Sequence, residues 1–533
     1  MQDRGEVVLA VPVDNAPCVI KASDGPHGRR AIGQQPFLPA LGPGGASVIV
    51  SRVSASTSAS VSSPRAVLPT TPSLPRIAWA PILTVAGVVL AALLAVSGRY
   101  GYHRDELYFI QAGGHFALGY PDQPLLTPVV SWTMNALAPR SLLVLRTPAA
   151  LAGVASIVSA GLIAREAGGG RRAQAIAASS CAAALVVLAT SHFLTTETLD
   201  LAFSSVVCLL LVRLLRTEDE RLWVVAGAVL GIGLLNKLLV GILAAAVIGS
   251  LLVVGPRTHL RSRWVAAGAT LALLGALPYV AWQVAHGVPQ AAVAHSQAQG
   301  GEEGGRAGFI PFQIVLVGPL LVPVWLAGLV GLLRAEGWRR YRCFGVAYLA
   351  LVVIMLATSG KAYYVAGFYP LLLGFGSLRA DAWLDRGGPV RRWLLAGAIA
   401  LTAAASAFIG LSVLPVRDLG GSIVEKLDST EGEMVGWPRF VATVASVYHE
   451  LPPATRARIV IFTKNYGEAG AIDLFGPARG LPHAYSGHNG FSEWGPPLSS
   501  DTAAILVGEE LEATVASDFR GARSGRTSTT ASA

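Results

Sequence analysis

Long apolar runs alternate with short polar segments through most of the chain. Each run has about 15 to 25 residues, near the length that an α-helix needs to cross the hydrocarbon core of a bilayer. The pattern therefore predicts about eleven transmembrane helices. The run from 222 to 254 permits two interpretations, one long tilted helix or two helices that divide at Asn236 and Lys237. The runs fall at about 77–97, 141–163, 174–190, 198–214, 222–236, 238–254, 264–285, 309–333, 343–358, 362–378 and 393–414.

The two ends of the chain lack this pattern. Residues 1–76 are rich in Ser, Ala, Pro and Gly, which predicts a disordered tail; the sequence leaves open whether they belong to the mature protein. Residues 415–518 alternate helical and strand patterns, which predicts a small soluble α/β domain before a second disordered tail at 519–533. Its expected elements are helices at 438–451 and 466–475 and strands at 458–463 and 502–507.

Composition also indicates a membrane protein. Charged residues make up only 14% of the 533 residues and hydrophobic residues 53%, whereas soluble globular chains carry about 25% charged residues. The expected fold class is an all-α polytopic membrane protein with a small C-terminal α/β domain. The net charge of +9 does not indicate nucleic-acid binding, because the basic residues lie mostly in short loops between apolar runs. The four cysteines include no C-x-x-C pair, so neither a disulfide framework nor a zinc ribbon is indicated.

The loops between the runs predict an orientation. If the N-terminus lies in the cytosol, the inner loops hold 17 basic residues and the outer loops hold 6. This excess on the inner side follows the positive-inside rule. The sequence thus predicts a multi-pass protein of the plasma (inner) membrane, with a cytosolic N-terminus and a transmembrane domain over 77–414. The loop 99–140 and the C-terminal domain then lie outside.

A cluster of ionisable residues opens the first outer loop. It comprises His103, Arg104, Asp105 and Glu106, directly after the first apolar run. A carboxylate at this surface could act as a general base on an acceptor hydroxyl. Because neighbouring carboxylates on a turn point in different directions, we expect only one of them to face a reacting centre. The alternative is that both acids are first-turn charges of a helix over 107–118.

Two further polar positions lie near this loop. Asp122 and Gln123 stand in a turn before a helix, where Asp122 either contacts a substrate or caps the helix. Arg146 lies inside the second span, near its outer end. A charged side chain there needs water, a phosphate or a carboxylate such as Asp105 as its partner, so Arg146 is a candidate for substrate binding or for a structural ion pair.

The second outer loop adds Glu197 and Asp200. Glu197 fits a capping arrangement behind the preceding threonines. Asp200 would lie about one turn inside the 198–214 span, where ionisable side chains are costly and usually functional. Both acids are candidates for substrate contacts.

Two lysines stand at outer helix ends. Lys237 and Lys361 could each contact a phosphate as a point charge, or could extend to the membrane interface. Tyr363 and Tyr364 follow Lys361, which also suits an aromatic belt at the membrane surface. The sequence permits both interpretations for each lysine.

Four stretches occur in an order that is typical of one family. They are 102–108 with 119–124, 195–200, 360–364 with 369–370, and 465–470 with 486–489 and 494–497. On these stretches the chain resembles membrane glycosyltransferases of the GT-C fold. The most similar group is the bacterial branch of glycosyltransferase family 39, the superfamily of protein O-mannosyltransferases and of the lipid A aminoarabinose transferase.

The resemblance implies a hexosyl- or pentosyltransferase that moves one sugar, with inversion, from a polyprenyl-phosphate donor to an acceptor outside the cytosolic leaflet. The acceptor would be a hydroxyl of a cell-envelope glycan, a lipid or a protein. The resemblance implies that the pair Asp105 and Glu106 is catalytic and that Lys361 lies near the donor phosphate. The second-loop acid of the family corresponds to Glu197 or Asp200.

The sequence leaves open two alternative functions and the binding of a divalent metal. A transporter or flippase of a lipid-linked sugar also carries ionisable residues in its membrane part, but the two halves of this chain show no repeat. A membrane scaffold that presents the C-terminal domain would not need the charges at 103–106. No regular metal-ligand spacing is present, yet acidic loops can bind divalent ions, so a divalent metal is left open.

Overall fold

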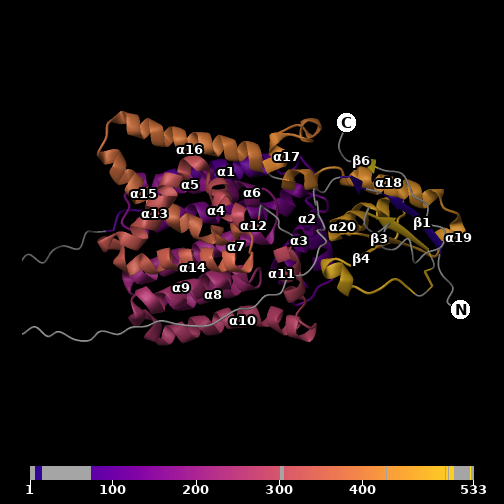
Figure 1. Ribbon diagram of the computed structural model, residues 1–533, viewed down its shortest axis with the longest axis horizontal. Helices are drawn as coiled ribbons and strands as arrows, with labels where there is room; N and C mark the ends of the chain where they lie inside the picture. The colour runs from indigo at the N-terminus through magenta and orange to yellow at the C-terminus, as the bar shows by residue number, and fades with distance from the viewer. Residues whose placement is uncertain are drawn as a thin grey trace, which may run out of the picture. The chain divides into compact units, whose positions relative to one another are not determined.

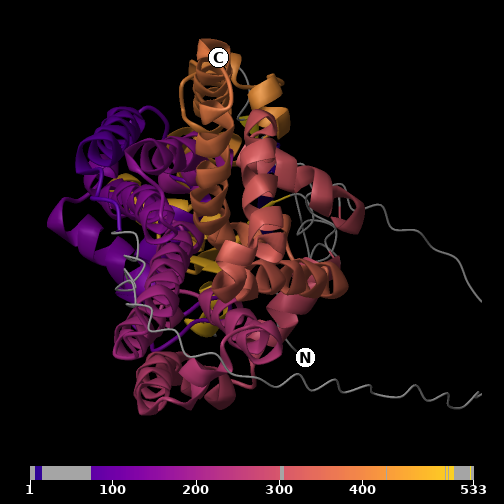
Figure 2. The same cartoon turned by 90° about the vertical axis from the view of Figure 1, so that its left-hand side faces the viewer.

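The computed structural model describes residues 6–11, 13–14, 74–299, 305–427, 429–498, 500–501, 503–508 and 528–529. Helices make up most of these residues (Figure 1, Figure 2). These described residues all belong to one compact unit. The mostly helical fold class is confirmed for the described part of the chain.

Every predicted apolar run contains helix. Among the described residues, six helices are long and apolar enough to cross a membrane, and eight spans result if each of two bent pairs counts as one. The predicted number of about eleven is therefore not confirmed. The six are α1 (Trp79–Val96), α4 (Leu142–Glu166), α7 (Thr196–Thr217), α10 (Arg263–Ala285), α14 (Arg342–Thr358) with η4 (Glu336–Tyr341) before it, and α16 (Pro389–Gly410).

Two runs that look continuous in the sequence are bent in the structure, by 59° near Ala184 and by 84° near Gly318. Gly318 adopts a φ of +93°, which glycine tolerates, and Pro319 follows it. A run of apolar residues does not report such a break, so the single span predicted at 309–333 is a bent pair. The helices are α5 (Arg171–Ala183) and α6 (Leu185–Ser191) in the first pair, and α12 (Gly305–Val317), η3 (Pro319–Leu321) and α13 (Val322–Arg334) in the second.

The run 222–254 forms two helices, α8 (Leu222–Leu234) and α9 (Leu239–Val254). The joint between them contains Asn236. Its side chain accepts a hydrogen bond from Thr127 Oγ1 at 2.5 Å and donates one to the Thr196 carbonyl at 2.8 Å. These bonds satisfy a fully buried amide where the chain leaves a helix, and they hold Lys237 next to α7. The interpretation as two helices is thus confirmed.

The segment 99–140, which the sequence predicts as the first outer loop, contains two helices, α2 (Arg104–Gly114) and α3 (Leu126–Leu137), which pack together. The helix predicted at 107–118 begins three residues earlier, because His103 caps it. Gly113 permits the close approach, since a Cβ there would lie 2.3 Å from the Pro128 carbonyl oxygen. The other helical elements of the membrane part are η1 (Arg257–Arg261), α11 (Pro289–Gln299), η5 (Ala362–Phe368) and α15 (Tyr369–Asp385).

Three strands of the C-terminal region and one N-terminal strand form a small parallel sheet in the order β1-β5-β3-β4. The predicted strands and helices of this region appear within a residue or two, whereas β4 and β1 were not predicted. At residues 6–11 the structure therefore differs from the predicted disordered tail. The elements are β1 (Glu6–Val11), α18 (Trp437–Glu450), α19 (Pro453–Arg456), β3 (Ile459–Thr463), α20 (Tyr466–Phe475), β4 (Ala484–Ser486) and β5 (Ala503–Val507). The short elements are β2 (Val13–Asp14) paired with β6 (Ser528–Thr529), and η6 (Val416–Asp418), α17 (Ile423–Leu427), η7 (Ser429–Met434), η8 (Pro477–Arg479) and η9 (Asn489–Glu493).

The sheet shares a hydrophobic core with the first outer loop. Leu107 and Tyr108 of α2 lie in the same buried cluster as Ile461 of β3, Ile472 of α20 and Phe440 of α18. Figure 1 shows α2 and α3 beside these C-terminal elements. Burial of apolar area across this junction stabilises the position of α2 by about 25 cal/mol per Å². The N-terminus of α2 is therefore positioned by both parts of the chain.

Candidate active site

The N-terminus of α2 carries the predicted acidic pair in a reciprocal capping arrangement. His103 Nδ1 accepts a hydrogen bond from the Asp105 amide at 3.2 Å, and the Glu106 carboxylate accepts one from the His103 amide at 2.9 Å. These contacts satisfy two amides that a helix start leaves without partners. Both acids also lie in the first turn, where the helix dipole favours negative charge.

Glu106 forms a buried ion pair with Arg146. Arg146 Nε and Nη2 donate to the two carboxylate oxygens at 2.9 and 2.8 Å, and the Leu194 amide donates at 3.1 Å. The side chains of Glu106 and Arg146 are 0% and 1% exposed. Arg146 also donates to the Ser97 and Gly101 carbonyls. The partner of Arg146 is thus Glu106, not Asp105, and the pair links α2 to α4.

Asp105 points to a different partner and remains 28% exposed. The Tyr466 hydroxyl of α20 donates a hydrogen bond to Asp105 Oδ1 at 2.7 Å. His103 Nδ1 lies 3.7 Å from Oδ2 and Arg104 Nε lies 3.8 Å from Oδ1. Of the two acids, Asp105 is therefore the one whose carboxylate is accessible to another molecule.

Glu433 forms contacts with His103 and Arg104, the two residues that precede Asp105. One of its oxygens lies 2.8 Å from His103 Nε2 and 3.0 Å from Arg104 Nε. Since His103 Nδ1 accepts the bond from the Asp105 amide, the proton of a neutral imidazole is on Nε2, facing Glu433. Glu433 lies in η7, between α16 and the sheet, so a residue distant in sequence orients the predicted cluster.

Asp122 lies between α2 and the C-terminal region. Its carboxylate accepts a hydrogen bond from the Tyr108 hydroxyl at 2.7 Å and faces the Asn489 amide at 3.4 Å. Burial raises the pKa of Asp122 to about 7, and the neighbouring Asp105 charge adds to that increase. Gln123 beside it is buried, and within the described part of the chain its Nε2 has no hydrogen-bond partner.

A second charged cluster surrounds Lys237. Its ammonium group forms an ion pair with Glu197, and these side chains are 19% and 25% exposed. Thr196 Oγ1 donates to Glu197 at 2.9 Å. Lys237 Nζ also lies 5.1 Å from the centre of the Tyr364 ring, within the range of a cation–π contact. The pair joins the start of α7 to the α8–α9 joint.

Lys361 and its aromatic neighbours lie in the same cluster. Lys361 Nζ lies 5.8 Å from the centre of the Tyr363 ring, and the Tyr363 hydroxyl donates to Glu197 at 3.4 Å. Asp200 is 4% exposed, and its Oδ1 accepts a hydrogen bond from the Val240 amide at 2.9 Å. The structure thus brings the candidates from 195–200 and from 360–364 together. The hydrogen bond of Asp200 links α7 to α9.

Four site neighbours were not predicted as site residues: Tyr108, Glu433, Tyr466 and Asn489. Asn465 and Glu468 form a capping box at the start of α20, and that Asn-x-x-Glu spacing is visible in the sequence. The helix predicted at 466–475 already places Tyr466 at a helix N-terminus, but the sequence does not show that its hydroxyl lies next to Asp105. Within the described residues, no group of three or more His, Cys, Asp and Glu side chains is arranged to hold a metal ion.

Comparisons with known proteins agree with this architecture. Residues 122–282 match the family model for dolichyl-phosphate-mannose-protein mannosyltransferases. The fold is similar to that of ArnT from Cupriavidus metallidurans bound to undecaprenyl phosphate, with 15% identity over 76% of this chain and 86% of that chain and a TM-score of 0.55. The apo state of the same protein gives 16% identity over 76% and 84% of the two chains, with a TM-score of 0.51.

A more distant match is the oligosaccharyltransferase AglB from Archaeoglobus fulgidus in complex with an inhibitory peptide and a dolichol-phosphate. It has 14% identity over 76% of this chain and 64% of that chain, with a TM-score of 0.46. A search of curated protein sequences gave no match. The predicted resemblance to membrane glycosyltransferases of the GT-C fold is confirmed by the family model and by the shared fold with ArnT.

Proposed function

We propose that this protein is an inverting glycosyltransferase of a cell membrane. It moves one sugar from a polyprenyl-phosphate donor to a hydroxyl of an extracytoplasmic acceptor. Two similarities support the donor class: the ArnT structure of similar fold is bound to undecaprenyl phosphate, and the matched family is described by dolichyl-phosphate-mannose. In this proposal the apolar helices hold the isoprenoid tail of the donor, and the first outer loop lies outside the membrane.

The observation that carries this proposal is that Asp105 and Glu106 differ in exposure and in hydrogen-bond partners. Glu106 is fully buried, and Arg146 and two backbone amides occupy its carboxylate. Asp105 is partly exposed at the same helix start. A general base must reach the proton that it removes. Asp105 meets this requirement, and Glu106 serves as a structural residue in the proposed site.

The proposed reaction is a single displacement. The carboxylate of Asp105 takes the proton of the acceptor hydroxyl while the hydroxyl oxygen forms a bond to the anomeric carbon. The bond from that carbon to the phosphate oxygen breaks, and its electron pair leaves with the lipid phosphate. Attack from the face opposite to the leaving group inverts the anomeric configuration. The leaving group is already anionic, so cationic side chains can stabilise it without a general acid.

The cluster around Lys237 supplies such cations. Lys237 and Lys361 stand beside Tyr363 and Tyr364, and the ion pair of Lys237 with Glu197 is partly open to solvent. The ammonium group of a lysine is a point charge on a flexible stem, so Lys237 can turn from Glu197 to a phosphate without a change of the backbone. We assign the donor phosphate to this cluster. Asp122 and Gln123 stand between α2 and the C-terminal loop and are assigned to the sugar or the acceptor.

The proposal can be tested in a strain that lacks the gene. Mass spectrometry of envelope glycans, lipids and glycoproteins should show one missing sugar, and the wild-type gene should restore it. A gene carrying Asp105→Asn should not restore it, whereas Asp418→Asn, at an exposed carboxylate of η6, should. An envelope that is unchanged by the deletion, with accumulation of lipid-linked sugar on one leaflet, would favour a flippase instead.

A further inference from the structure

Groups from five parts of the chain lie near Asp105 or interact with its charge. His103 and Arg104 precede it on α2, and Glu433 of η7 contacts both of them. Tyr466 of α20 contacts its carboxylate directly. His488 and Asp122 are the other titratable groups whose charge state responds to Asp105. Among these neighbours, the Tyr466 hydroxyl lies at 2.7 Å from Asp105 Oδ1, the shortest of the distances to the Asp105 carboxylate given above.

The packing of its ring fixes the position of the Tyr466 hydroxyl, which donates the hydrogen bond to Asp105. Its ring packs 5.1 Å from that of Tyr108 and 4.9 Å from that of His488, and the Arg104 guanidinium lies 5.8 Å from its centre. Burial, together with the negative charge of Asp105, raises the pKa of Tyr466 well above its usual value of 10. The hydroxyl therefore keeps its proton at physiological pH. A bond to a charged acceptor is about twice as strong as one between neutral groups.

The backbone around Tyr466 is shaped for this contact. Asn465 and Glu468 cap the start of α20, so the first turn of the helix is well defined. Gly467 and Gly470 lie against α2: a Cβ at Gly467 would lie 2.6 Å from Arg104 Cβ, and one at Gly470 would lie 3.0 Å from the Leu107 backbone. Two glycines three residues apart thus let α20 approach α2 closely enough for the hydroxyl to reach Asp105.

We propose that Tyr466 is a positioning residue for Asp105, and that the C-terminal region is therefore part of the active site. The inference rests on the proposed function of Asp105 as the base. With Oδ1 held by the Tyr466 hydroxyl, the carboxylate keeps one orientation and its other oxygen, Oδ2, receives the acceptor proton. Tyr466 itself neither gains nor loses a proton in the reaction.

The first test is Tyr466→Phe, which removes the hydroxyl and keeps the ring. Purified protein is assayed with synthetic polyprenyl-phosphate-linked mannose, glucose and arabinose as donors and with envelope from the deletion strain as acceptor. We expect kcat to fall about 10-fold with an unchanged KM for the donor. The acid limb of the pH profile of kcat/KM should move to higher pH, because the charged carboxylate loses a hydrogen-bond donor. A purely structural role would not move this limb.

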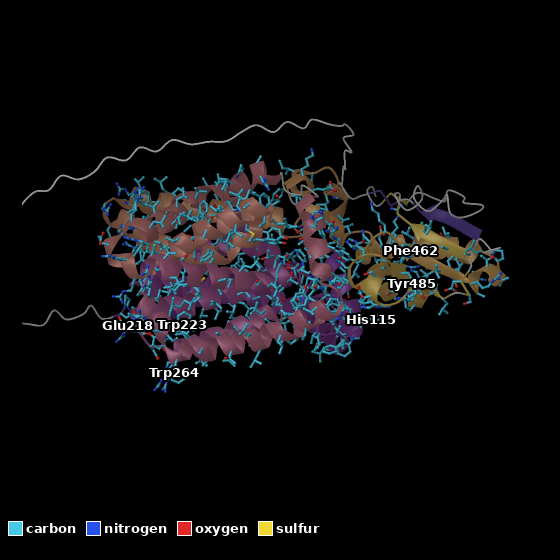
Figure 3. The ribbon with its side chains drawn as sticks, turned by 60° about the horizontal axis from the view of Figure 1, so that its bottom comes forward. His115, Glu218, Trp223, Trp264, Phe462 and Tyr485 are labelled. Atoms are coloured by element: carbon cyan, nitrogen blue, oxygen red, sulfur yellow. The ribbon has the colours of Figure 1, made fainter. Side chains whose placement is uncertain are left out.

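Tyr485→Phe is the matched control. Tyr485 lies beside Phe462 on the sheet (Figure 3), packed near Val460, Ala504 and Leu506 rather than against Asp105. This variant should keep the wild-type rate and pH profile. The amount of folded protein is compared for all variants by size-exclusion chromatography in detergent, so that a loss of folding is separated from a loss of rate.

Gly467→Ala is the second variant, and it keeps the Tyr466 hydroxyl. Alanine favours the helix, but its Cβ pushes α20 away from Arg104, so the same loss of kcat and the same shift of the acid limb are expected. Gly397→Ala in α16, where a Cβ meets nothing within 4 Å, is the control. The inference is overturned if folded Tyr466→Phe or Gly467→Ala protein keeps the wild-type kcat and acid limb while Asp105→Asn is inactive. If Asp105→Asn is active, the proposed function fails instead.

Discussion

The two carboxylate–cation pairs of this site, Glu106 with Arg146 and Glu197 with Lys237, differ in exposure and in partner. The first pair is fully buried, and its arginine binds both carboxylate oxygens. The second pair is about one-fifth exposed, and its lysine is a point charge beside two tyrosines. A planar guanidinium suits a fixed bidentate pair, whereas an ammonium on a flexible stem can change partner. The buried pair therefore fixes the position of the loop, and the partly exposed pair is the one suited to a phosphate.

The largest effect is expected when the buried pair is broken. Arg146→Met leaves the Glu106 carboxylate buried without its cation, which should lower the free energy of unfolding by about 3–5 kcal/mol. Thermal unfolding in detergent measures this loss. The double variant Arg146→Met with Glu106→Leu should recover most of it, because no charge is then left buried. A double variant as unstable as the single one would show that the pair does not carry the stability of this loop.

Loss of the ion pair between Lys237 and Glu197 is expected to change activity more than stability. Lys237→Met should lower the free energy of unfolding by less than the roughly 3–5 kcal/mol expected for Arg146→Met, because its ion pair is partly exposed, yet raise the KM for a polyprenyl-phosphate sugar about 10-fold through the loss of one charged contact. Steady-state kinetics with a synthetic donor measure this change. Lys426→Met, at an exposed lysine of α17, is the control. An unchanged KM would remove Lys237 from the donor site.

The smallest effect is expected at Asp122. Its carboxylate accepts hydrogen bonds from the Tyr108 hydroxyl and the Asn489 amide, which are neutral donors. Its pKa of about 7 lies above the ordinary value of 3.8. The stability that this group contributes is full below about pH 4 and is lost as pH rises through 7, since the folded state binds the proton more tightly. Asp122→Asn removes this loss, so at pH 8 the variant should be more stable than the wild type by about 1 kcal/mol, a figure reduced for the partial exposure of the carboxylate.

The pH dependence distinguishes this effect from a simple change of packing. The stability difference between Asp122→Asn and the wild type, measured by thermal unfolding, should shrink when the pH is lowered from 8 to 5. Asp418→Asn, which replaces an exposed carboxylate, should show no such trend. A difference that is constant over this range would contradict the raised pKa of Asp122.

The helices could be predicted from the sequence because burial in a bilayer demands long apolar runs, and each run does contain helix. The bends at Ala184 and Gly318 could not, because composition does not report the angle between two halves of a run. The split at Asn236 was one of two interpretations. Its confirmation depends on hydrogen bonds to Thr127 and Thr196, which join segments far apart in the chain.

The candidate site likewise has residues that could be predicted from the sequence and residues that could not. The sequence predicts the charged cluster at the start of α2 and the two lysines, because ionisable residues at a membrane exit stand out from apolar surroundings. It does not tell Asp105 from Glu106, since that distinction depends on Arg146 forty residues later. Tyr466 and Glu433 also approach α2 from more than 300 residues away. Such contacts follow from tertiary packing, which no local pattern encodes.

The rate of sugar transfer by purified Asp105→Asn protein measures directly whether Asp105 is the base. Asparagine keeps the size and the acceptor oxygen for Tyr466, but it cannot take a proton. We expect transfer from a polyprenyl-phosphate sugar to fall at least about 100-fold, the lower range for loss of a general base, while the protein still folds and binds the donor. Transfer at a near-normal rate by the folded variant would contradict the assignment of Asp105 as the base.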